Sequence, residues 1–536
     1  MPNAKEPDIW QNMWREFSGG RLWLDRAVVL AYAAFTGLCV VAFAMLTHWA
    51  FDAFEWLYQR LPWLVLLWTP LVTVAVAWVT RRWFPTLAGS GIPQVMVALE
   101  PGLQLHQRTR FAALRLSISK ILLASAGLLG GLSVGREGPS VQVAAGIMLH
   151  ARRWLRKGSE MDVHALLVAG GAAGLAAAFN APLAGVVFAL EELGHKLPPR
   201  NSGLIIAAIV TAGVVGISFF GNDSFLGHLH VTTMHWGLLG PGICVTVICG
   251  VLGGLFARLM VASITGVASP LNQLRKRYPL RFAAALGLLL AGMGLATSGA
   301  TFGGGAESVR AMLEGEARLS PLFVPLKLIS TWVTSWAGVP GGIFAPSLSV
   351  GAGVGQDVAG WFHDPALRAP LIALGMAAFL AAVTQTPLTA FIIVMEMVDG
   401  GAMVLSLMTA AMLSSLIARM IAKPLYASLA SHMLGNLLAA QAAAEAVARA
   451  VNTPQAPATE LPSSAQPGAA PASPAASAEA ASVVGQMAQG QGEQDPSQAI
   501  EEPAGPAAQM APETTQEKEQ EGAQEKPPTQ LPRPFA

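Results

Sequence analysis

Charged residues are scarce in this chain. Asp, Glu, Lys and Arg together make up 12% of the 536 residues, whereas apolar residues make up 53%. A soluble protein carries about 25% charged residues, because its surface faces water. The formal net charge is only +1, so the composition offers no strongly basic surface for a nucleic-acid partner. These shortages exclude an ordinary water-soluble protein and make the lipid bilayer the expected environment.

Cysteine is also rare, and the motifs of common hydrolases are missing. Cys39, Cys244 and Cys249 all lie in apolar stretches without metal-ligand spacing, so we interpret them as packing residues. We therefore predict no metal site and no cofactor. The sequence has no His-Glu-x-x-His, and no Gly-x-Ser-Gly segment precedes a matching histidine. The chain is not expected to be an enzyme.

The sequence contains several long runs without charged residues. A helix needs about 20 mostly apolar residues to cross the hydrocarbon core of a membrane. The period-2 alternation of a β-barrel is absent, and an open sheet would leave unpaired backbone groups in lipid. The sequence thus predicts an all-α, multi-pass membrane protein. The runs without Asp, Glu, Lys or Arg are 27–51, 61–80, 165–190, 202–221, 236–257, 328–356 and 369–395.

The chain divides into three regions by composition. Residues 1–22 are polar with spaced aromatic residues, which predicts an interfacial helix on the cytoplasmic side. Residues 23–438 form the membrane domain. Residues 439–536 are rich in Ala, Pro, Gln and Glu and predict a disordered cytoplasmic tail, whose first residues, up to 451, can extend the last helix. The first apolar run is too long for a cleavable signal peptide. Basic clusters place the connecting loops and both termini in the cytoplasm by the positive-inside rule; they lie at 108–115, 152–157, 275–281 and 419–423.

The membrane domain contains an internal repeat. Residues 170–177 recur at 375–382, an offset of 205 that also pairs Glu191 with Glu396. A second block, at an offset of 207, pairs Lys120 with Lys327. Internal repeats of this kind are typical of transporters whose substrate sites lie at broken helices near the midplane of the bilayer.

Three Gly- and Pro-rich interruptions lie at membrane depth, at 89–93, 135–139 and 341–346. Broken backbone is tolerated in a bilayer only where it is buried in protein or lines a cavity. Each interruption is followed by a new helical stretch, so three helix N-termini are expected to converge on an internal site. Helix N-termini present free N–H groups and a positive dipole end, which favour an anion.

These segments carry a family resemblance. Gly89-Ser-Gly-Ile-Pro, Gly135-Arg-Glu-Gly-Pro and Gly341-Gly-Ile-Phe-Ala-Pro resemble the GSGIP, GREGP and GGxFxP signatures of the chloride channel (CLC) family, in the family's order. Lys423-Pro-Leu-Tyr resembles the segment that supplies its inner tyrosine. The resemblance spans about residues 85–428. It implies an all-α fold with an inverted repeat and a homodimer with one anion pathway per subunit. It also implies that the protein lies in a cell membrane, the bacterial inner membrane.

The resemblance also implies an anion site. Ser90 resembles the hydroxyl donor to the central anion, Tyr426 the second hydroxyl, and Ile343 and Phe344 the backbone N–H donors. Two alternatives stay open, because Ser also favours helix N-caps and Tyr also anchors helices at membrane interfaces. For Ile343 and Phe344 the alternative is that their side chains only pack.

Two glutamates resemble residues that move protons in the family. Glu137 resembles the gating glutamate: its carboxylate can occupy the anion's own site, and protonation would release it. The alternative is a structural partner for Arg136. Glu192 resembles the internal proton-transfer glutamate of exchangers, which channels typically replace; the alternative is a helix-end carboxylate facing water. Glu191, which has a repeat mate in Glu396, is assigned a structural role.

The leading functional hypothesis is H⁺/Cl⁻ antiport, with chloride, protons and lipid as partners. A passive voltage- or pH-gated chloride channel of the same family is the alternative. An intramembrane hydrolase using Ser90 is disfavoured by the missing motifs. A cation transporter is disfavoured because helix N-termini repel cations, and the fluoride-exporting branch because Ser90 and GREGP are intact. Gln94 departs from the Glu of many relatives, and no stretch resembles the CBS domains that many relatives carry.

Overall fold

The computed structural model describes residues 20–159, 161–194, 201–221, 236–266, 269–315, 319–362 and 364–452. Over these ranges the backbone is helical and forms no sheet, only two isolated bridges. The all-α prediction is confirmed. The chain separates into residues 1–453 and 454–536, and the first unit holds every described residue. The expected interfacial helix falls outside the described residues up to residue 19, as does the tail from residue 453.

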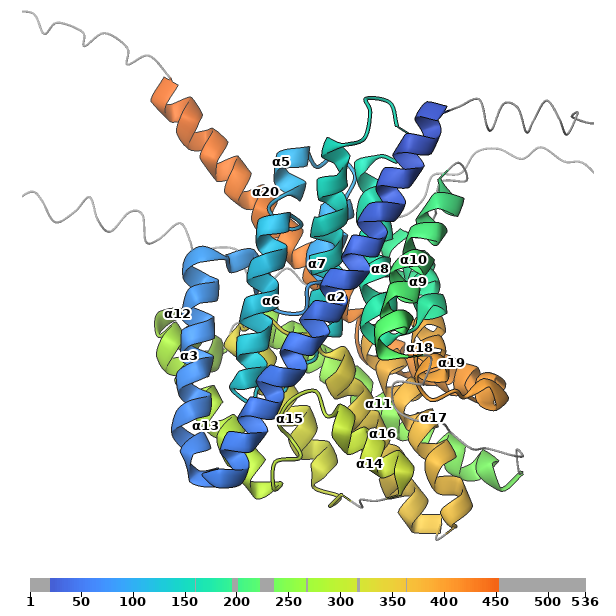
Figure 1. Ribbon diagram of the computed structural model, residues 1–536. Coiled ribbons are helices and arrows are strands. Elements are labelled where there is room, and N and C mark those ends of the chain that lie inside the picture. Colours follow the sequence, from blue (N-terminus) through green and yellow to red (C-terminus); the bar gives the residue numbers. More distant parts are fainter. Residues whose placement is uncertain are drawn as a thin grey trace, which may run out of the picture. The chain divides into compact units, whose positions relative to one another are not determined.

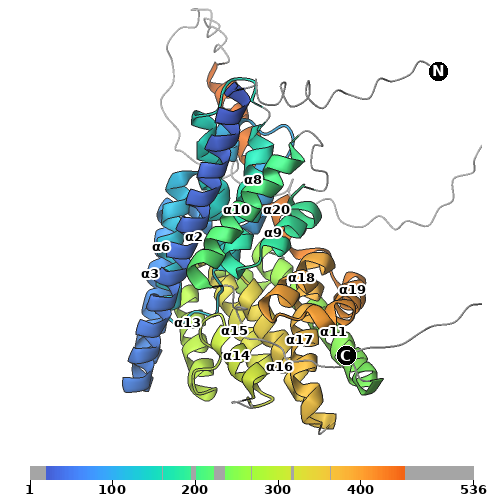
Figure 2. The ribbon, with the colours of Figure 1, turned by 45° about the vertical axis from the view of Figure 1, so that its right-hand side comes forward.

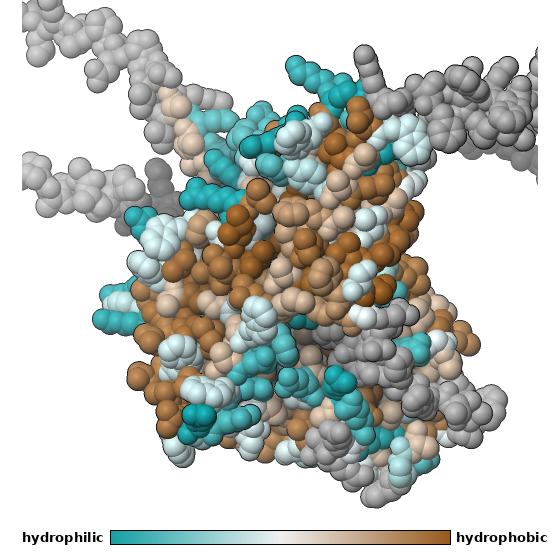
Figure 3. Space-filling view, in the orientation of Figure 1, coloured by the Kyte–Doolittle hydropathy of each residue, from teal (hydrophilic) through white to brown (hydrophobic). Residues whose placement is uncertain are grey.

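Seven helical segments are long and apolar enough to span a membrane, which confirms the multi-pass prediction. Apolar side chains cover much of the face shown in Figure 3, and hydrophilic groups gather at its top and in its lower half. The helices that carry these segments are α2 (Gly20–Arg60), α3 (Val65–Trp83), α10 (Ser202–Phe220), α11 (Leu239–Thr265), α13 (Pro279–Ala296), α17 (Pro365–Thr384) and α19 (Val404–Ile421).

The remaining helices lie between these segments in the chain or follow them. They are α4 (Ile92–Leu99), α5 (Leu105–Arg108), α6 (Leu114–Leu129), α7 (Glu137–His150), α8 (Val163–Phe179), α9 (Pro182–Phe188), α12 (Pro270–Arg277), α14 (Ala306–Glu314), α15 (Phe323–Ala337), α16 (Phe344–Phe362), α18 (Pro387–Met397) and α20 (Leu425–Asn452). The 3-10 turns are η1 (Pro62–Leu64), η2 (Pro85–Leu87), η3 (Ala151–Arg153), η5 (Trp236–Leu238) and η6 (Gly401–Met403), and η4 (Ala189–Gly194) is a π-helical turn. Helix α20 continues past residue 438, the end expected for the membrane domain.

Three of the long apolar runs, 165–190, 328–356 and 369–395, are each broken into two helices. The run 165–190 breaks between α8 and α9, where Asn180 adopts a left-handed conformation with φ of 56°. Gln385, at the same place in the repeat, has φ of 62° between α17 and α18. The run 328–356 breaks between α15 and α16. The Gly- and Pro-rich segments therefore end helices inside the protein, as the sequence predicts.

The repeat appears in the packing of its helices. Helices α7 and α8 pack closely, as do their counterparts α16 and α17. Glycines make this approach possible: a Cβ at Gly170 would lie 2.8 Å from the Ala144 carbonyl oxygen, and one at Gly375 would meet the Gly351 backbone. Figure 1 shows α2 running obliquely across α7 and α8, and Figure 2 shows α10 beside α2 and α8. The broken helices are thus enclosed by protein.

Candidate anion and proton site

The three broken segments are joined through their backbones. The amide of Gly89 donates to the Val339 carbonyl at 3.1 Å, and the amide of Gly341 donates back to the Gly89 carbonyl at 3.1 Å. Gly135 and Gly342 exchange two hydrogen bonds of 2.8 Å. These bonds satisfy polar groups that have no water to bond with at this depth. They also fix the starts of α4, α7 and α16 relative to one another, as predicted from the Gly/Pro interruptions.

Ser90 lies at the convergence of these segments. Its hydroxyl is buried and has no hydrogen-bond partner among the described residues. The N-cap of α4 is Gly91, not Ser90, and no side chain caps this helix, so the N-cap interpretation of Ser90 is wrong. Gly91 has φ of 111°, and a Cβ there would lie 2.8 Å from the Gly138 carbonyl oxygen. Only glycine can therefore hold the Ser90 hydroxyl this close to the start of α7.

Tyr426 approaches the same place from the first turn of α20. Its side chain is only 1% exposed, and its hydroxyl has no hydrogen-bond partner among the described residues. The Tyr426 hydroxyl lies near that of Ser90 and within electrostatic range of Glu137 and Glu192. This burial does not fit an interfacial anchor, whose hydroxyl would reach water. Two buried hydroxyl groups without partners are donors available to a ligand.

Ile343 and Phe344 form the start of α16, and both are buried. The first N–H groups of a helix have no partner within the helix, so this end can donate to an anion. The Phe344 ring packs between Phe179, with ring centroids 5.9 Å apart, and Tyr426, at 6.0 Å. The Phe344 side chain therefore packs against two rings, while the first N–H groups of α16 have no partner within the helix.

Glu137 is the first residue of α7 and is only 4% exposed. Its carboxyl group lies against the Ala345 amide at the start of α16, and its Oε2 has no hydrogen-bond partner. A negative group at two helix N-termini is favoured by their dipoles. Arg136 instead reaches α2, where Nη1 donates to the Ala44 carbonyl at 3.0 Å. Glu137 thus places a carboxylate where an anion would bind.

A cavity of about 900 Å³ opens beside Glu137. Its buried end is lined by Gly135, Glu137 and Ala345, and its exposed end by α2 and α14, including His48 and Glu307. This lining cannot be predicted from local sequence, because α2 and α14 are far apart in the chain. The uncharged run 27–51 ends just before the polar face that α2 turns to the cavity. This cavity can give the Glu137 carboxyl group access to one side of the protein.

Glu192 lies in the π-helical turn η4 that follows α9, and it is 9% exposed. Its burial does not fit a carboxylate facing open water. A π-turn adds one residue per turn and re-aims the side chains after it; such turns occur frequently at functional sites. The sequence carries no signal for this turn. Glu192 lies within electrostatic range of Tyr426, and it is not part of the cavity lining.

Glu191 and its repeat mate Glu396 cap each other's helices. The carboxylate of Glu191 accepts two N–H bonds from the first turn of α18, at 3.1 and 2.7 Å. The carboxylate of Glu396 accepts two from the first turn of α9, at 3.2 and 2.7 Å. Each cap satisfies donors at a helix start that a membrane interior leaves without water. The geometry gives Glu191 the structural role assigned from the repeat.

The two buried lysines bind backbone carbonyls. Lys120 Nζ donates to the Leu87 and Gly89 carbonyls at 2.8 and 2.7 Å, directly before Ser90. Gln94 holds the same loop through the Thr86 and Ala88 carbonyls at 3.2 and 2.7 Å. Lys327 Nζ donates to three carbonyls at 301–303, at 2.8 to 3.2 Å. Gln94 stands where many relatives have Glu, and the loop before Ser90 is still held by hydrogen bonds from Gln94 and Lys120.

Comparison with known proteins gives one family. The profile described as "Voltage gated chloride channel" matches residues 72–419. The H(+)/Cl(-) exchange transporter ClcA of Cronobacter sakazakii is 30% identical over 388 residues, which are 69% of this chain and 81% of that protein. The transporter of the same name from Vibrio cholerae serotype O1 is 29% identical over 380 residues, 67% of this chain and 78% of that protein.

Solved structures of similar fold agree. A slow cyanobacterial Cl⁻/H⁺ antiporter matches with a TM-score of 0.63 and 25% identity, covering 77% of this chain and 98% of that one. A CLC-type fluoride/proton antiporter matches with a TM-score of 0.60 and 20% identity, covering 79% and 99%; at that identity the likeness concerns the fold alone. The profile match includes Ser90, Glu137, Glu192, Ile343 and Phe344 and ends before Tyr426.

Proposed function

Because the chain belongs to the voltage-gated chloride channel family, we propose that it is a transporter that exchanges chloride for protons across a membrane. Its similar relatives are named H(+)/Cl(-) exchange transporters, and a similar solved structure is a Cl⁻/H⁺ antiporter. It is a multi-pass membrane protein rather than an enzyme. One observation carries the proposal: an unpartnered hydroxyl from Ser90, another from Tyr426 and the Glu137 carboxyl group meet at helix starts inside the protein.

In this proposal, chloride binds between Ser90, Tyr426 and the N–H groups of Ile343 and Phe344. Partial charges of helix ends and hydroxyls hold an anion weakly enough for rapid release, whereas a Lys or Arg would hold it too tightly. The Lys120 ammonium does not enter the site; it donates hydrogen bonds to backbone carbonyls of the loop before Ser90. The site therefore combines selectivity for anions with turnover.

Glu137 acts as the gate. Its ionised carboxylate competes with chloride for the start of α16, and its protonated form leaves that place free. The cavity of about 900 Å³ connects it with one aqueous side. A proton taken up there opens the anion path, so one carboxyl group couples the two fluxes.

Glu192 exchanges protons with the opposite side. It is buried near Tyr426 and outside the lining of the cavity, so the proton route and the anion route separate beyond Tyr426. In the proposal this side is the cytoplasmic one, which the positive-inside rule favours for the basic clusters. The proposal includes a homodimer in the bacterial inner membrane with both termini cytoplasmic, as the family resemblance implies.

Flux through liposomes tests the proposal. The full chain is reconstituted, and an imposed chloride gradient is expected to drive protons uphill. Glu192→Gln keeps size and polarity but cannot carry a proton at neutral pH, so chloride should still move while proton flux collapses. Glu100→Gln, which changes an exposed glutamate, is the matched control and should couple normally. Wild-type protein that moves chloride without protons would identify a passive channel and overturn the exchange mechanism.

A further inference from the structure

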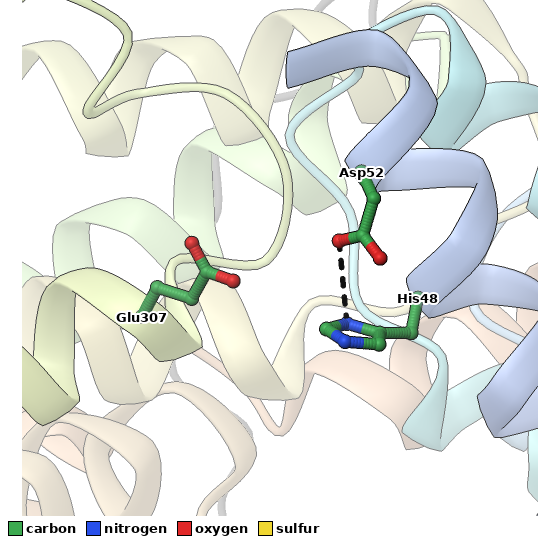
Figure 4. A group of neighbouring side chains, drawn as sticks. All are labelled: His48, Asp52 and Glu307. Atoms are coloured by element: carbon green, nitrogen blue, oxygen red, sulfur yellow. Dashed lines mark ion pairs between the residues drawn. The ribbon is translucent and has the colours of Figure 1, made fainter. Parts of the chain in front are cut away.

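The exposed end of the cavity carries a group of metal-ligating side chains. His48 and Asp52 are four residues apart on α2 and therefore share a face, and Glu307 comes from the first turn of α14. His48 Nδ1 and Asp52 Oδ1 are 3.6 Å apart. One ligand atom from each of the three residues lies within 4.8 Å of the others. Figure 4 shows Glu307 facing the His48–Asp52 pair across the gap between the two helices.

The charges around this group are unbalanced. Glu55, one turn further along α2, interacts with both Glu307 and Asp52 through like charge. Among the described residues, no Lys or Arg forms an ion pair with Asp52, Glu55 or Glu307. Glu55 and Glu307 line the cavity together with Arg136 and Arg310, and Arg310 pairs with Glu314 at 2.8 Å. The like charges of Asp52, Glu55 and Glu307 therefore lie next to one another. A bound cation would remove this mutual repulsion.

We propose that His48, Asp52 and Glu307 bind one divalent transition-metal ion of the Zn²⁺ class, with Glu55 as a neighbouring charge. Zn²⁺ takes imidazole nitrogen and carboxylate oxygen at about 2.0 to 2.2 Å and completes four-coordination with water. The imidazole selects this class over Mg²⁺ and Ca²⁺, which prefer oxygen ligands alone. All three side chains are exposed, so they can close the remaining distance by changing rotamers.

The ion would act on the anion path by charge. This step rests on the proposed function, because the same cavity is lined by Glu137. A water molecule occupies about 30 Å³, so an ion with a few waters fills a small part of a cavity of about 900 Å³. Steric plugging is therefore the smaller effect. Neutralising the carboxylates should raise the local chloride concentration and speed entry from this side at low chloride and low ionic strength.

Calorimetric titration of the purified full-length protein with Zn²⁺ tests the site. Wild type should bind one Zn²⁺ per chain. His48→Ala and Glu307→Gln should each weaken binding by at least about 10- to 100-fold, the loss seen even for residues that only orient metal ligands. His106→Ala, which changes an exposed histidine on α5, is the control. Equal binding by wild type and both variants, or no binding to wild type, would overturn the site.

Further measurements keep the result interpretable. Asp52→Asn gives a third variant if one of the others fails to fold, and an excess of Mg²⁺ that displaces Zn²⁺ would overturn the transition-metal assignment. Binding is measured without transport, so it stands or fails independently of H⁺/Cl⁻ exchange. In liposomes at low chloride, Zn²⁺ on the side of the cavity should raise the initial chloride rate of wild type but not of His48→Ala. Slowing by Zn²⁺ in wild type alone would overturn the electrostatic effect.

Discussion

Gly135→Ala should open the gate without touching a titratable group. Gly135 does not have a positive φ, so alanine adds no backbone strain. Its Cβ, however, would lie closer than 3.0 Å to Glu137 Oε2 and 3.0 Å from the Ala345 Cβ. Real Cβ atoms do not settle at such distances, and the carboxylate is the flexible partner. The Glu137 side chain must therefore retreat to ordinary contact, 3.4 Å or more from the new methyl group.

The retreat weakens the contact between the Glu137 carboxyl group and the Ala345 amide. A hydrogen bond to a charged group contributes about 1.5 to 3 kcal/mol. At about 1.4 kcal/mol for each factor of ten, the closed gate should lose about 10- to 150-fold in occupancy relative to the open one. Chloride flux at neutral pH should rise towards its acidic value, and fewer protons should move for each chloride.

Paired chloride and proton fluxes across a pH series measure this effect. Gly292→Ala is the control, since nothing lies within 4 Å of a Cβ at that position. In a Glu137→Ala background the carboxylate is gone, so adding Gly135→Ala should change little. A Gly135→Ala protein with wild-type coupling and wild-type pH dependence would refute the placement of Glu137 against the start of α16.

Four further outcomes are expected. Glu137→Gln should abolish proton movement and make chloride flux insensitive to pH, because the amide cannot titrate; continued uphill proton transport would contradict the gate. Ser90→Ala should weaken chloride binding more than nitrate binding, measured by calorimetry, since chloride is the more strongly hydrated anion; unchanged preference would count against the hydroxyl donor. Lys120→Met leaves two buried carbonyls without donors, at about 1 to 3 kcal/mol each, so the melting temperature in detergent should fall, unlike that of exposed Lys276→Met. A chain ending at Asn452 should insert and carry chloride at near-normal rates, and a dead truncation would show that the Ala/Pro-rich tail is required.

The site was largely predictable because its residues lie in contiguous motifs. Each Gly/Pro interruption identifies a helix start, and a helix start carries its own anion-binding groups. Three of these helix starts carry Ser90, Glu137, Ile343 and Phe344. The sequence could therefore indicate these residues, and the structure adds that the three helix starts converge. Tyr426 comes from a different helix, and its approach to Ser90 depends on packing that the family resemblance indicated and the composition did not.

Other features could not be predicted from local sequence. The π-turn at Glu192 depends on how α9 packs, and no residue in 189–194 requires it. The partners of Lys120 and Lys327 are backbone carbonyls, which carry no residue identity to recognise. Helix α2 is 41 residues long and continues beyond its uncharged run, and its residues His48 and Glu55 line a cavity that the local sequence does not reveal. The reciprocal caps left a readable signal, since the offset of 205 pairs Glu191 with Glu396.

The exchange of caps between Glu191 and Glu396 has the form of a contact between two identical subunits. In a dimer with a two-fold axis, residue i of one copy meets residue j of the other, and j meets i. Here each copy is one half of a single chain, and the carboxylate that completes α9 is supplied from α18, as that of α18 is supplied from the end of α9. Neither half can complete its own helix start. The two halves of the repeat therefore meet through a self-complementary contact within one polypeptide.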